Sequence, residues 1–80
     1  MQMTMDNAHR TKDLYEASFL YAAGCKLIRL LDDHGRFWFV FEGEELCRQL
    51  TDSYWRKEAT INAKEFADSI RTLKDRIFAR

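Results

Sequence analysis

The feature that most constrains the fold is the stretch from Lys26 to Glu42, in which two apolar runs flank a short polar segment. The first run reads KLIRLL, the second reads RFWFVF, and the residues between them are DDHG. Aromatic and β-branched residues favour strands, and Gly35 can adopt the positive φ that a tight reversal requires. The pattern therefore predicts a β-hairpin.

The second strand of this hairpin is apolar on both faces. Side chains alternate along a strand, so Phe37, Phe39 and Phe41 share one face while Trp38 and Val40 share the other. Both faces therefore need cover.

Length and charge limit what the rest of the chain can be. It has 80 residues, 46% of them apolar, with thirteen basic and thirteen acidic residues. Such a length forms one domain, and zero net charge excludes the broad positive field that drives non-specific binding to nucleic acid. No apolar run approaches the roughly 18 residues that span a bilayer, and no export signal is present, so we expect a cytoplasmic protein without a membrane partner.

Capping residues mark three helices. Asp13 can act as the N-cap of the first, with Glu16 returning the hydrogen bond in a capping box, and Gly24 ends it. A second helix follows Gly43, and a third begins after Asn62. Residues 1–11 lack apolar periodicity and are expected to form a flexible N-terminal tail, which leaves residues 12–80 as a single domain.

These elements give an α+β fold in which three helices pack with a small antiparallel hairpin. The segment Ala59-Thr60-Ile61 can add a short third strand, which gives the order α-β-β-α-(β)-α. The second face of the sheet is then covered either by a second copy of the chain, in a homodimer, or by the third helix folding back.

Several blocks of residues resemble a known family. They are DLY at 13–15, AAGCKLI at 22–28, FVFE at 39–42, YW at 54–55, INA at 61–63 with Phe66, and LK at 73–74. With this spacing the chain resembles a family of short uncharacterised proteins of bacteria and their phages, classed as a domain of unknown function. The resemblance runs from roughly residue 12 to the C-terminus and implies a self-contained small domain, with an origin in a phage or mobile element. It supplies no catalytic or binding residues.

No pattern of metal-ligating or catalytic residues emerges. Cys25, Cys47, His9 and His34 are suitable metal ligands, but none forms the close pair that small zinc sites use, so we expect no metal and no cofactor. The two cysteines are expected to be reduced and buried, with a disulfide between them as the alternative. Neither a nucleophile motif nor a phosphate-binding loop is present, so we expect neither an enzyme nor a small-molecule substrate.

The leading functional hypothesis is a non-enzymatic interaction module that self-associates, as a homodimer, and binds a protein partner. Its candidate contact residues are large apolar side chains, namely Trp38, Val40 and Trp55.

The alternative hypothesis is a small nucleic-acid-binding or regulatory protein. It uses the locally basic C-terminal helix, with Arg71, Lys74, Arg76 and Arg80. Arg29 and Arg36 also stand near Trp38 on the hairpin, where phosphate contacts can accompany a stacking aromatic ring.

Overall fold

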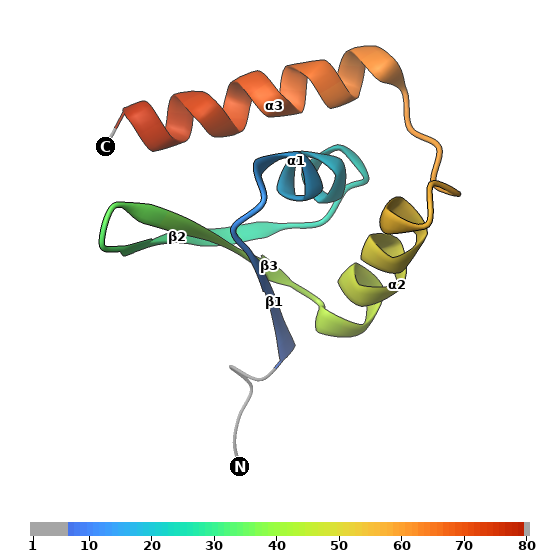
Figure 1. Ribbon diagram of the computed structural model, residues 1–80, viewed down its shortest axis with the longest axis horizontal. Helices are drawn as coiled ribbons and strands as arrows, with labels where there is room; N and C mark the ends of the chain where they lie inside the picture. Colours follow the sequence, from blue (N-terminus) through green and yellow to red (C-terminus); the bar gives the residue numbers. More distant parts are fainter. Residues whose placement is uncertain (1–6, 80) are drawn as a thin grey trace.

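The computed structural model describes residues 7–79 and contains a three-stranded antiparallel sheet and three helices (Figure 1). In chain order the elements are β1 (Ala8–Thr11), α1 (Leu14–Ala22), β2 (Leu27–Asp33), β3 (Arg36–Glu42), α2 (Glu44–Trp55) and α3 (Ala63–Phe78). This β-α-β-β-α-α order is an α+β fold, which confirms the predicted fold class.

The predicted hairpin is formed by β2 and β3, which pair antiparallel. Its turn consists of His34 and Gly35, with φ of 55° and 88°. Two successive residues with positive φ match the right-handed twist of the flanking strands, which is why short hairpins favour such turns. The Asp32 carboxylate secures the reversal by accepting a hydrogen bond from the Gly35 N–H at 3.0 Å.

The third strand comes from the N-terminal region and not from residues 59–61. Ala8–Thr11 pair antiparallel with β3, so the strands lie in the order β1-β3-β2. These four residues therefore belong to the sheet and not to the flexible tail predicted for residues 1–11, whose first six residues lie outside the described part of the chain. The segment at 59–61 has no regular secondary structure, which corrects the third strand expected there.

Helix α1 covers one face of the sheet and lies between the sheet and α3 (Figure 1). Asp13 caps its N-terminus as predicted, by accepting a hydrogen bond from the Glu16 N–H at 2.8 Å. Phe39 and Phe41 point to this side and are almost fully buried. The core they join consists of Ala17, Phe19, Leu20, Cys25, Cys47 and Leu73.

The side chain of Glu16 does not complete the expected capping box. Instead its carboxyl group lies buried between β1, α1 and α2, where four side chains surround it. His9 Nε2 and Thr51 Oγ1 each lie 3.0 Å from Oε2, while Thr11 Oγ1 and Trp55 Nε1 lie 3.1 and 3.4 Å from Oε1. This Glu16 cluster ties the short strand β1 to two helices, because its members come from all three elements.

Candidate binding site on the outer face of the sheet

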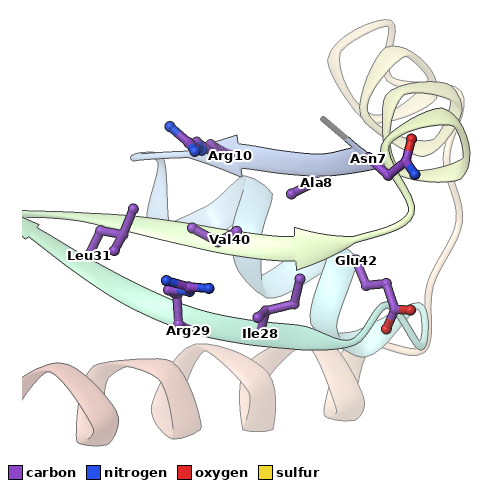
Figure 2. Close-up of a pocket in the computed structure, with 8 residues that line it drawn as sticks. All are labelled: Asn7, Ala8, Arg10, Ile28, Arg29, Leu31, Val40 and Glu42. Carbon is purple, nitrogen blue, oxygen red and sulfur yellow. The ribbon is translucent and has the colours of Figure 1, made fainter. Parts of the chain in front are cut away.

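The face of the sheet that points away from α1, called here the outer face, carries a row of three side chains across the strands. Arg10 of β1 and Arg29 of β2 both pair with Val40 of β3. Paired residues of antiparallel strands point to the same side, so two arginines flank one valine, as Figure 2 shows. In the next position along the sheet, Leu31 pairs with Trp38.

A β-bulge brings Arg29 to this face. The register of β2 shifts between Leu27, which pairs with Phe41 on the core side, and Arg29, which pairs with Val40. Strict alternation from Leu27 would have turned Arg29 toward the core, whereas the extra residue, Ile28, restores it to the outer side. Both Ile28 and Arg29 consequently face outward.

These side chains surround a pocket of about 300 Å³. Its floor is apolar, and Val40 at its centre is only 5% exposed. Ile28, which is 44% exposed, forms part of the wall. Among the described residues, the lining consists of Asn7, Ala8, Arg10, Ile28, Arg29, Leu31, Val40 and Glu42 (Figure 2).

The outer face carries positive charge that the described part of the chain does not neutralise. Among residues 7–79, no carboxylate lies within 4.0 Å of the cationic groups of Arg10, Lys12, Arg29 or Arg36. Asp33 pairs in register with Arg36, but its carboxylate contacts His34 Nδ1 at 3.0 Å. The guanidinium groups of Arg10, Arg29 and Arg36 therefore have no ion-pair partner within these residues and can bind an anionic ligand.

Trp38 is half-buried on the outer face, and one side of its ring is already occupied. The Lys12 ammonium lies 4.8 Å from the ring centroid, within the range of a cation–π contact. This contact leaves less of the ring free for stacking with a ligand.

The structure brings together two of the three predicted contact residues. Trp38 and Val40 both lie on the outer face, in the same strand. Trp55 lies at the end of α2 on the helix side of the sheet, where it is 57% exposed and its indole donates to Glu16. It belongs to the Glu16 cluster and not to the outer face.

The basic residues predicted on the last helix do not form one surface. Arg71 and Lys74 are exposed beside a shallow hollow that also includes Asp75 and Phe78. Arg76 lies about 140° around the helix axis from Arg71, because each residue advances about 100°. Arg80 lies outside the described residues.

The buried thiols are poorly suited to nucleophilic chemistry. Cys25 and Cys47 are both free and buried. Burial, together with the neighbouring Cys25 thiol, raises the pKa of Cys47 from 9.0 to about 12, so its reactive thiolate is rare at neutral pH. Within residues 7–79, no three His, Cys, Asp or Glu side chains are grouped so that they could hold a metal ion.

Sequence reasoning missed Arg10, Ile28 and Leu31 as members of this site. Arg10 could not be assigned because residues 1–11 show no apolar periodicity, and Ile28 could not be assigned because an apolar run gives no sign of where a bulge lies. The sequence carries no signal for this strand, because three of the residues in Ala8–Thr11 are polar and show no apolar alternation.

Comparison with known proteins assigns the chain to a family, but it does not indicate an activity. The family model described as "Domain of unknown function (DUF5659)" matches residues 6–79. Neither the curated proteins nor the solved structures contain a significant match. Among the described residues, no helix is both long and apolar enough to cross a membrane.

Proposed function

The chain belongs to the family of unknown function DUF5659, and from that premise we propose that it is a non-enzymatic module that binds a segment of another protein on the outer face of its sheet. The observation that carries this proposal is the apolar pocket floored by Val40. Concave apolar sites with a few convergent polar groups are where proteins usually bind ligands. An apolar patch rimmed by polar residues is also typical of protein interaction sites.

The size and chemistry of the pocket favour a peptide side chain as its occupant. About 300 Å³ is at the lower end of the volumes usual for ligand sites. The floor is aliphatic, and the charged groups stand at its rim. Docking of one apolar anchor residue with polar contacts around it is a recurring way in which domains bind peptides.

Self-association, which the sequence predicts, remains a hypothesis of its own. A two-fold dimer through the outer face would place the same face of both copies in the interface, so Arg10, Arg29 and Arg36 of each copy would lie in one contact region together. Like charges placed together in an interface oppose binding. Light scattering of the wild type and of Trp38→Glu tests this hypothesis, since a dimer that uses this face would become monomeric in the variant.

Nucleic-acid binding is less well supported by the same face. Proteins that bind single strands stack bases on aromatic side chains, yet none of the described residues that line the pocket is aromatic, and Lys12 covers one side of Trp38. Retention on an oligothymidylate column, with elution at moderate salt, would favour this alternative.

Selection from a random peptide library displayed on phage tests the proposal. Peptides enriched on the wild type should fail to bind Ile28→Glu, because this substitution places a carboxylate in the pocket wall. Leu46→Glu is the matched control, because Leu46 is 57% exposed on α2 and absent from the pocket lining. Absence of enrichment, or peptides that bind Ile28→Glu as well as the wild type, would contradict the proposal.

A further inference from the structure

The charges around the pocket indicate what kind of segment it takes, an inference that rests on the proposed function. We infer that the ligand is an acidic amphipathic peptide segment, which inserts an apolar side chain over Val40 and places carboxylates on Arg10 and Arg29.

The spacing follows from the strand register. Arg10 and Arg29 pair with the same residue of the central strand, from opposite sides. Adjacent strands lie about 4.8 Å apart, so the two arginine backbones are about 10 Å apart across an apolar floor. Two carboxylates can therefore be bound on either side of one apolar anchor. An extended peptide covers this distance in about three residues.

The charge of the site selects acidic groups. The guanidinium group presents its N–H donors in a planar fork that matches a carboxylate, so such pairs are often bidentate. Neither arginine has a carboxylate partner within residues 7–79. Among the described residues that line the pocket, Glu42 is acidic, and it pairs in register with Ala8 and not with an arginine. A basic segment would meet two cations at the rim of the site that have no carboxylate partner within residues 7–79.

The floor distinguishes a peptide from a polyphosphate. Phosphate groups would also pair with Arg10 and Arg29, but nucleic-acid sites on sheets add aromatic rings on which bases stack. Here Val40 lies between the two arginines, Ile28 and Leu31 lie beside Arg29 on β2, and all three side chains are aliphatic. An aliphatic pocket floor suits an aliphatic side chain such as leucine better than a nucleic-acid base. It therefore favours an acidic peptide over a single-stranded nucleic acid as the ligand.

The first test reads the composition of the peptides that display enriches on the wild-type chain. Acidic residues on both sides of an apolar residue are expected. Enriched peptides that are neutral or basic but still depend on Ile28 would overturn this inference and leave the proposed function standing. Absence of any peptide that depends on Ile28 would overturn both.

The second test measures the affinity of an enriched peptide, labelled with fluorescein, by anisotropy. Arg10→Gln and Arg29→Gln are each expected to weaken binding about fivefold, the loss typical of one partly exposed charged contact, and added salt should weaken it further. Arg71→Gln removes the same charge from α3 and should leave the affinity unchanged. Equal affinities for all three variants, or tighter binding of labelled oligothymidylate that Arg10→Gln and Arg29→Gln abolish, would contradict the inference.

Discussion

Removal of the Glu16 side chain should cost a large part of the stability of this domain. The carboxyl group is the shared acceptor for four side chains, from His9, Thr11, Thr51 and Trp55. In Glu16→Ala, these donors keep their positions but lose their acceptor. The short strand β1 is then held mainly by its backbone pairing with β3. We therefore expect β1 to be the element that the substitution destabilises most.

The magnitude follows from how well water can replace the lost acceptor. Trp55 is more than half exposed and His9 is partly exposed, so both can be rehydrated. Thr11 is buried and Thr51 is half-buried, and a buried donor without a partner costs about 1–3 kcal/mol. We therefore expect a loss of about 3 kcal/mol. A chain of this length has a total stability of only about 4–12 kcal/mol, and the loss corresponds to a fall in Tm of roughly 12–24 °C.

Urea denaturation followed by circular dichroism measures this loss. Glu45→Ala is the matched control, because Glu45 is exposed on α2 and contacts Arg48, so its removal should cost less than about 1 kcal/mol. A double-mutant cycle with Thr51→Val should show a coupling energy of about 1 kcal/mol between the two positions. If Glu16→Ala and Glu45→Ala lose the same stability, the structural importance assigned to the Glu16 cluster is refuted.

Three further predictions concern titration and the turn. Burial raises the pKa of Cys47 from 9.0 to about 12, so the unfolded chain loses this proton before the folded chain does as pH rises. The free energy of unfolding should therefore fall above about pH 9. Between about pH 8 and about pH 10.5, denaturation of Cys47→Ala should show a smaller fall in this free energy than the wild type, and an equal fall would contradict the prediction. His34→Asn should raise the free energy of unfolding, measured by denaturation, by about 0.5 kcal/mol, because asparagine tolerates positive φ better than histidine. A loss of stability would contradict the positive φ of residue 34 in the turn. The Lys64 ammonium, 2.7 Å from Asp68 Oδ1, lowers the pKa of that carboxylate, so Lys64→Gln should raise this pKa in an NMR titration, and an unchanged value would disprove the contact.

The hairpin and the fold class could be predicted because their signals are local. The apolar runs on either side of DDHG specify two strands, and Asp13 and Asn62 do cap α1 and α3, as their side chains accept hydrogen bonds from Glu16 and Glu65. Each of these features depends on residues within a few positions of one another. Sequence patterns record such features directly.

Strand β1 could not be predicted because its stabilising contacts are remote in sequence. Its inward side chains, His9 and Thr11, are polar, so the strand shows no apolar alternation. Both side chains bind the Glu16 carboxyl group, which makes their burial possible, and Thr51 joins the same cluster from 35 residues beyond Glu16 in the chain. A polar strand of four residues therefore looks like a tail until its partners are placed.

The binding site was missed in part for the same reason. Val40 and Trp38 could be assigned to one face by alternation, but Arg10 depends on β1 and the orientation of Arg29 depends on the bulge at Ile28. The sequence indicates that Arg29 and Arg36 lie near Trp38 on the hairpin, but helical periodicity made α3 the more visible basic surface. It does not reveal that Arg10 of one edge strand and Arg29 of the other flank Val40.

Mapping of amide chemical shifts during a titration with an enriched peptide tests the central claim most directly. Binding at the outer face predicts that the largest shifts cluster in Ala8–Arg10, Ile28–Leu31 and around Val40. Shifts concentrated on α3 near Arg71 and Lys74, or at Trp55, with the strands unaffected, would contradict the assignment of this face as the binding site.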